Sequence, residues 1–119
     1  MKTYKELEVW KRSTQMVIDI YTITKNFPKD ELYGITSQLR RAAVSIPANI
    51  AEGHGRNYSK ETIQFLHIAR GSLYETETLL ELSFRVGYID TSEQTFLTNT
   101  LNECIRMLNG LIRHFQNKR

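Results

Sequence analysis

The pattern of apolar and polar positions along the chain predicts four long helices and no strand. Apolar residues recur at spacings of three and four, and no segment alternates with a period of two. Helices are expected over residues 4–25, 31–52, 59–86 and from 90 or 91 nearly to the chain end. Because the connections are short, neighbouring helices should be antiparallel. We therefore expect an all-α, up-down-up-down antiparallel four-helix bundle that forms a single domain over residues 1–119.

The expected helix ends rest on residue types that cap or stop helices. They are the capping-box pair Thr3 and Glu6, the stops Gly53 and Gly87, and the caps Ser59 for the third helix and Asp90 or Thr91 for the fourth.

The distribution of apolar residues around each helix predicts the buried surfaces. The fourth helix carries one apolar stripe within residues 97–115. The third carries two, and its second arc consists of Ile68, Leu79, Leu82 and Val86. A lone bundle needs about one buried stripe per helix, whereas the first three helices carry more. This surplus predicts that the chain associates with itself as a homo-oligomer.

Pro47 lies inside the second helix, in a run of small and branched apolar residues. A proline at such a position removes a backbone donor and costs roughly 3 kcal/mol, so packing must compensate. The expected core positions of this helix are Ile35, Leu39, Ala42, Ile46 and Ile50. Val44, Pro47 and Ala51 share another face with Arg40, which is expected to face the third helix or a neighbouring subunit.

Glu75 falls in the middle of the second arc of the third helix, where a carboxylate needs a partner. We expect it to form a structural ion pair with Arg40 or, failing that, with Arg41. With no nucleophile or metal cluster beside it, a structural role is favoured over a catalytic one.

The charge of the chain suggests a nucleic-acid ligand, while an ordinary solvated surface charge is the alternative reading for each basic residue taken singly. The net charge is +3, and residues 1–56 hold nine Lys and Arg against six Asp and Glu. Basic side chains neutralise phosphates, and such binding weakens with salt. Few aromatic residues are expected beside these charges on exposed faces, so base stacking is not indicated. The candidate binding residues are Lys11, Arg12, Arg41, Arg56, Lys60, Arg106, Arg113, Lys118 and Arg119.

The residue types needed for catalysis or metal binding do not occur at useful spacings. The three histidines are scattered, and Cys104 lies on the stripe of the fourth helix as a core residue. The glycines around His54 resemble a phosphate loop only faintly, because the Gly-Lys-Ser/Thr of that motif is missing. We expect no enzyme activity, no metal and no cofactor. The lone cysteine and the lack of a long apolar run predict a cytoplasmic protein with no membrane contact.

Several segments together resemble a known family. They are residues 4–10, 27–28, 32–34, 38–53 and 69–72 with Glu75, and residues 87–88. In these segments the chain resembles the 23S rRNA-intervening sequence proteins, or ribosomal S23 family. That family is related in turn to the accessory variability determinant of diversity-generating retroelements. The resemblance implies a four-helix bundle in a homopentameric ring, and it supplies no catalytic residue.

Two functional hypotheses follow from the charge, the surplus apolar surface and the resemblance. The first is a non-enzymatic oligomeric scaffold that binds RNA or DNA through the phosphate backbone. The alternative is an adaptor that holds a protein partner, such as a polymerase, in an oligomeric ring. An enzyme is a third reading, which a deep pocket with two or more titratable groups would favour.

Overall fold

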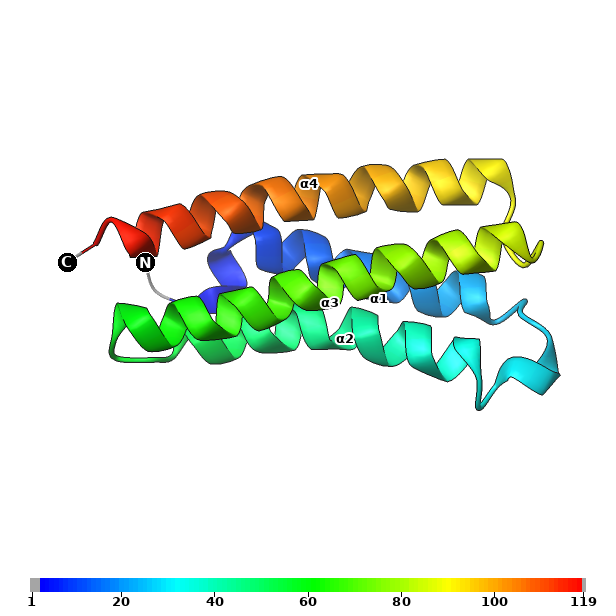
Figure 1. The fold of residues 1–119 in the computed structure, drawn as a ribbon, viewed down its shortest axis with the longest axis horizontal. Coiled ribbons are helices and arrows are strands. Elements are labelled where there is room, and N and C mark those ends of the chain that lie inside the picture. The colour runs from blue at the N-terminus through cyan, green and yellow to red at the C-terminus, as the bar shows by residue number, and fades with distance from the viewer. Residues whose placement is uncertain (1–2, 119) are drawn as a thin grey trace.

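The computed structural model describes residues 3–118, and its regular elements in that range are all helical. Four long α-helices and two short 3-10 helices follow one another along the chain (Figure 1). They are η1 (Tyr4–Glu6), α1 (Glu8–Thr24), η2 (Lys29–Glu31), α2 (Ile35–His54), α3 (Ser59–Arg85) and α4 (Thr91–Gln116). The four predicted helices are confirmed, and no strand occurs among the described residues.

The four α-helices lie side by side around one core (Figure 1). Both α2 and α4 contact α1 and α3, so each helix has two helical neighbours. The molecule measures 48 × 24 × 21 Å, and both chain ends lie at the same end of it. We call this the terminal end, and it also holds the α2–α3 loop. The other end, which holds η2 and the α3–α4 loop, is called the η2 end.

The core forms where the predicted apolar stripes of the four helices meet. Met16 in α1, Leu39 in α2, Leu73 in α3 and Leu108 in α4 are all fully buried. Because a helix repeats every 3.6 residues, positions three and four apart stack into one stripe that can be buried together. The single stripe predicted for α4 is confirmed, since its members are buried or pack against the core.

The start of the chain differs from the prediction. Leu7 is extended, with φ −71° and ψ 129°, and it splits the expected first helix into η1 and α1. Thr3 caps η1, where its Oγ1 accepts from the Lys5 amide at 3.2 Å. Thr3 is therefore a helix cap, as predicted, but it caps a helix of one turn and not the long first helix.

The α3–α4 corner matches the sequence prediction. Gly87 has a positive φ of 87°, the left-handed conformation that glycine adopts at low cost. The Tyr88 amide donates to the Ser83 carbonyl at 2.8 Å, which is the hydrogen bond of a Schellman motif. Asp90 and Glu93 then form the predicted capping box at the start of α4. These two features end one helix and begin the next within a few residues.

At the α2–α3 corner, two predicted helix ends are wrong. α2 continues past Gly53 to His54, and Ser59 is the first residue of α3 and not its cap. Gly53 is buried, and a Cβ there would lie 2.9 Å from Phe65 Cβ. The Gly53 carbonyl accepts from Thr62 Oγ1 at 2.8 Å. Glycine is needed here because α2 and α3 approach closely.

The second arc of α3 is largely uncovered in the single chain. Ile68, Leu82 and Val86 are 51%, 46% and 59% exposed, whereas Leu79 is buried. Val44 on the neighbouring α2 is 41% exposed. The two apolar arcs predicted for α3 therefore have different environments, since the other arc lies in the core. Surface apolar groups that gather in this way are typical of interaction sites.

Pro47 does not interrupt α2, which stays helical on both sides of it. Ile46 and Ile50 are fully buried, as predicted, while Pro47 itself is half-buried. Next to it, the Ser72 hydroxyl of α3 donates to Ser45 Oγ at 2.9 Å. The Ser72–Ser45 hydrogen bond thus joins α2 to α3 close to the position where the proline removes a backbone donor.

Candidate nucleic-acid interface

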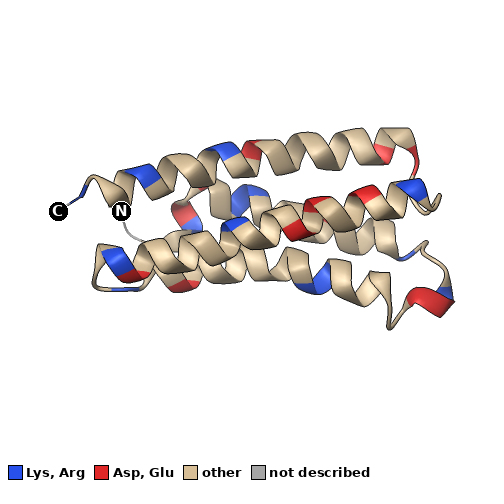
Figure 2. Ribbon diagram, in the orientation of Figure 1, with Lys and Arg blue, Asp and Glu red and all other residues tan. Residues whose placement is uncertain are grey.

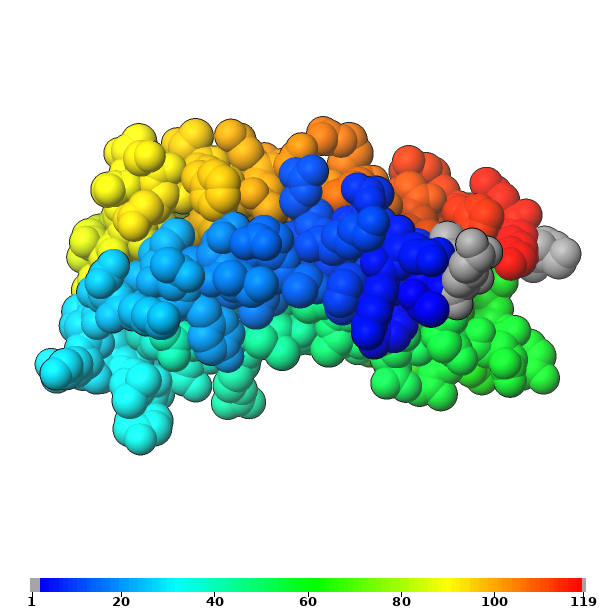
Figure 3. Space-filling model, turned by 180° about the vertical axis from the view of Figure 1, so that it is seen from behind, coloured from blue at the N-terminus to red at the C-terminus, as the bar shows by residue number. Residues whose placement is uncertain are grey.

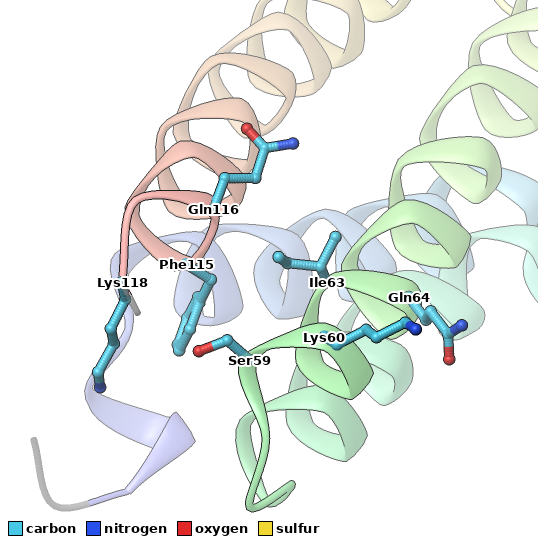
Figure 4. Close-up of a pocket in the computed structure, with 7 residues that line it drawn as sticks. All are labelled: Ser59, Lys60, Ile63, Gln64, Phe115, Gln116 and Lys118. Atoms are coloured by element: carbon cyan, nitrogen blue, oxygen red, sulfur yellow. The ribbon is translucent and has the colours of Figure 1, made fainter.

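Lys60 and Lys118 line one cleft at the terminal end of the bundle. The cleft has a volume of about 420 Å³ and lies between the start of α3 and the end of α4. Figure 4 shows the Ser59 hydroxyl and the Phe115 ring between the two lysines. The other lining residues are Ile63, Gln64 and Gln116. The lining therefore combines two cations, two amides and a hydroxyl, without a carboxylate.

The first turn of α3 borders this cleft through Ser59 and Lys60. Tyr58 is the N-cap and makes no side-chain capping hydrogen bond. The first turn of a helix has amides without intrahelical partners, and its dipole attracts anions. Lys60 lies on this turn beside Ser59, so side-chain and backbone donors lie close together. Helix starts of this kind bind phosphate groups. Glu61, on the same turn, is exposed and does not line the cleft.

Arg56 lies in the α2–α3 loop at the same end of the molecule (Figure 2). Its Nη2 binds Glu52 Oε2 at 2.5 Å, and its guanidinium lies 4.6 Å from the centre of the Phe65 ring. Similarly, Lys118 Nζ lies 5.6 Å from the centre of the Phe115 ring. Two of the candidate cations therefore lie beside aromatic rings, and both rings are half-buried.

The remaining candidates on α1 and α4 are spread over the surface. Lys11 Nζ lies 3.3 Å from Glu8 Oε2, and Arg12 Nη1 forms an ion pair with Glu103 Oε1 that joins α1 to α4. Each of these cations is thus already neutralised by a carboxylate. The last three candidates are Arg106 and Arg113, which are exposed on α4, and Arg119, which lies outside the described residues.

Arg40 and Glu75 do not pair within one chain. Arg40 is directed toward α1, where its Nε donates to Thr24 Oγ1 at 2.9 Å and its guanidinium lies 4.6 Å from the centre of the Tyr21 ring. Glu75 is exposed and lines a groove of about 480 Å³ with Arg41. Consecutive helix positions differ by 100°, so Arg40 faces α1 while Arg41 faces α3. The expected Arg40–Glu75 contact is therefore wrong within the chain.

The groove with Arg41 lies between α2 and α3 on the outside of the bundle. Its other lining residues are Gln38, Ala42, Ser45 and Ser72. It adjoins the uncovered second arc, since Glu75 lies between Ile68 and Leu82 on α3. A polar groove beside exposed apolar side chains is typical of a protein-binding surface.

The structure adds residues that the sequence analysis did not single out. Gln64 and Gln116 join Lys60 and Lys118 in the cleft at the terminal end. The spacing of Lys60 and Gln64 places them on one face of α3, which was readable from the sequence. Gln116 could not be found in this way, because its position depends on which helix ends meet.

Cys104 lies in the core, away from the candidate interface. Cys104 is fully buried, as predicted, and burial raises the pKa of its thiol to about 11. Among residues 3–118, no group of three or more His, Cys, Asp and Glu is placed to hold a metal ion. No helix in this part of the chain is both long and apolar enough to span a bilayer.

The comparisons with known proteins agree with the fold. The family model of the 23S rRNA-intervening sequence protein matches residues 5–110. The crystal structure of a protein of unknown function from the S23 ribosomal protein family of Bacteroides thetaiotaomicron is similar, with a TM-score of 0.79 and 28% sequence identity. The similarity covers 87% of this chain and 97% of that one. No curated protein matches. Because this family model matches most of the chain, the protein belongs to the 23S rRNA-intervening sequence protein family.

Proposed function

We propose that the protein is a non-enzymatic, oligomeric scaffold that binds RNA or DNA through phosphate contacts in the cytoplasm. The observation that carries the proposal is the cleft at the terminal end, in which Lys60 and Lys118 lie beside the first turn of α3. A phosphate in this cleft would accept hydrogen bonds from lysine, amide and hydroxyl donors. None of its lining residues is acidic, so no repulsion arises from the cleft wall.

Neighbouring cations extend this surface. Figure 2 shows Lys and Arg in the first turn of α3, in the loop before it and near the end of α4, all toward the terminal end. A nucleic-acid backbone places its phosphates in a row, so cations spread along one end can each neutralise one. Arg56 carries an ion pair with Glu52 and contributes less than an unpaired cation would.

If the chain forms an oligomer, each subunit carries one copy of this cleft. The proposal takes the chain as an up-down-up-down bundle that forms a homopentameric ring, and the exposed side chains of Ile68, Leu82 and Val86 support burial against another subunit. Linked sites bind a long polyanion more tightly than one site does, because the second contact is intramolecular. The interface form of the Glu75 ion pair, with an arginine of the next subunit, is part of this proposal.

Fluorescence anisotropy with a labelled single-stranded RNA of uniform sequence tests the ligand, and light scattering with and without RNA tests the assembly. The informative variant is Lys60→Gln with Lys118→Gln. Its control, Lys25→Gln with Lys29→Gln, removes the same charge from the η2 end. For single strands the slope of log K against log salt changes by about 0.7 per phosphate contact, so the first variant should lower it by about 1.4 per bound subunit.

This experiment shows whether RNA binding depends on lysines in the cleft or only on the net charge of the protein. Loss of affinity in the cleft variant with retention in the control supports the proposal. Equal losses mean that only total charge matters, and no RNA or duplex DNA binding at low salt refutes the nucleic-acid function.

A protein-binding adaptor is the second candidate, and the groove between α2 and α3 favours it. Arg41 and Glu75 give this groove charges of both signs beside the uncovered second arc. Such a surface suits a protein partner better than a polyanion, which Glu75 would repel. Replacing Leu82 by Asp should abolish capture of a partner while leaving RNA binding by the monomer intact; loss of both would contradict separate surfaces.

A further inference from the structure

The cleft at the terminal end contains an aromatic ring that phosphate binding alone does not use. Phe115 lines the cleft from α4, and Ile63 lines it from α3. Figure 3 shows, from behind, the end of α4 in red and the α2–α3 corner in green at this end of the molecule. The volume of about 420 Å³ falls within the range of small-ligand sites, roughly 300–1,000 Å³. The cleft therefore has room for a flat ring system beside the Phe115 side chain.

The face of the Phe115 ring is covered by a side chain that is free to leave it. Lys118 Nζ lies 5.6 Å from the centre of the ring. Lys118 is exposed and forms no ion pair within residues 3–118. Stacking of a nucleobase on an aromatic ring is worth more than a cation–π contact at an exposed site. A base can therefore replace the ammonium over the ring, and the released ammonium can bind a phosphate.

Phe65, the other ring beside a candidate cation, is less accessible than Phe115. The Arg56 guanidinium lies 4.6 Å from the centre of the Phe65 ring, and the ion pair with Glu52 holds it there. Phe65 also does not line the cleft. Phe115 is therefore the ring that a ligand in the cleft reaches.

The two lysines of the cleft lie on either side of the Phe115 ring. Figure 4 shows this ring and the Ser59 hydroxyl between Lys60 and Lys118. In a single strand each base has a phosphate on either side of it along the backbone, and such strands bind to grooves that combine cations with aromatic rings. The Gln116 side chain adds an amide that both donates and accepts, as the edge of a base requires. The arrangement matches one nucleotide with its two phosphates.

We propose that the cleft takes one nucleotide of a single-stranded RNA or DNA. Its base stacks on Phe115, and the phosphates on either side of it bind Lys60 and Lys118. A base within a duplex is paired and stacked on its neighbours, so it must be extruded before it reaches the ring. The cleft therefore selects single strands over duplexes. The stacked base is an addition to the phosphate contacts of the proposed nucleic-acid function, on which it rests.

Fluorescence anisotropy of the full chain with three labelled probes tests the stacking. The probes are oligothymidylate, an abasic oligomer with the same number of phosphates, and the duplex of oligothymidylate with oligoadenylate. The abasic oligomer should bind roughly tenfold more weakly than oligothymidylate, because it keeps the phosphates and lacks the bases. The duplex should also bind more weakly, despite its higher charge density. Oligouridylate, measured in parallel, shows whether the cleft accepts the RNA or the DNA strand better.

The failures of the two proposals look different in this assay. Equal affinity for the abasic oligomer and oligothymidylate overturns the stacked base and leaves phosphate binding intact. Absence of binding to every nucleic-acid probe at low salt overturns the nucleic-acid function as well. Tighter binding of an acidic, tyrosine-containing peptide than of oligothymidylate would show that the cleft takes a protein segment, and it too overturns the proposal.

A pair of matched variants separates stacking from a structural role of the ring. Phe115→Leu keeps an apolar side chain against the core and removes the flat ring. Its control, Phe96→Leu, removes a ring that is 53% exposed near the start of α4, toward the η2 end. Phe115→Leu should weaken oligothymidylate binding by roughly tenfold and leave the abasic oligomer unaffected, and Phe96→Leu should change neither.

Two further readouts apply to the Phe115 variants. The slope of log K against log salt should stay unchanged in Phe115→Leu, because no phosphate contact is lost, whereas Lys60→Gln with Lys118→Gln lowers it. Phe115→Trp should restore oligothymidylate binding, since it restores a flat ring. Equal weakening of both oligomers by Phe115→Leu would show that the ring acts only through packing, and the stacked base would then be refuted.

Discussion

Replacing Gly53 by alanine should destabilise the protein, although the same change normally stabilises a helix. In α2 an alanine gains about 1 kcal/mol over glycine from helix propensity. Its Cβ, however, would lie 2.9 Å from Phe65 Cβ and 3.2 Å from the Thr62 carbonyl oxygen. Both atoms belong to or adjoin the α3 backbone, so relief requires α2 and α3 to separate. Overpacking of this kind costs about 1–3 kcal/mol, which leaves a net loss of about 1 kcal/mol.

Gly110→Ala is the matched control for this prediction. Gly110 lies inside α4, and a Cβ there would meet only Arg113 Nη2, at 3.8 Å. The control should therefore stabilise by about 0.5–1 kcal/mol. With about 4 °C per kcal/mol for a chain of this size, the melting temperatures of the two variants should differ by roughly 8 °C.

Urea unfolding followed by far-ultraviolet circular dichroism measures both variants at one protein concentration, because self-association also shifts apparent stability. Equal slopes against urea would show that the two transitions are comparable. The argument from close helix approach fails if Gly53→Ala stabilises as much as Gly110→Ala does.

Three further predictions concern single contacts. Asp90→Ala removes the α4 capping box and should cost about 1 kcal/mol in urea unfolding; an unchanged midpoint would show that the box is dispensable. Cys104 should resist alkylation by iodoacetamide at pH 8 until the protein unfolds, because it is buried and its pKa is raised to about 11; rapid labelling of the native chain would contradict this. The hydrogen bond from Tyr88 to Glu31 raises the pKa of the phenol, so the unfolded chain ionises first and stability should fall above about pH 10. Urea titrations at rising pH should show a smaller fall in Tyr88→Phe, and identical profiles would exclude this contribution.

The helices could be predicted because their signals are local. Asp90 with Glu93 gave a capping box, and Gly87 gave a stop, since both motifs form within a few consecutive residues. Thr3 failed as a cap of the long helix because nothing in its neighbourhood showed that Leu7 would turn extended. Gly53 failed as a stop because its role depends on Phe65, which lies twelve positions away on another helix.

The candidate site could be predicted only in part. Lys60 and Lys118 were both recognised as basic candidates, but their common cleft depends on the end of α4 reaching the start of α3. Arg40 was placed toward the wrong neighbour because periodicity assigns a residue to a face of its helix and not to the helix that covers that face. Its contact with Thr24 on α1 follows from the arrangement of the bundle.

The hydrogen bonds that join α2 to α1 and to α3 have a consequence for local motion. Before Pro47, Arg40 ties the helix to α1 through Thr24 and Ser45 ties it to α3 through Ser72; after Pro47, Gly53 ties it to α3 through Thr62. A proline between such contacts interrupts the ladder of backbone hydrogen bonds that would otherwise make the helix open as one unit. Amide hydrogen exchange should therefore divide α2 into two cooperative units at Pro47, and only the first of them should exchange together with α1.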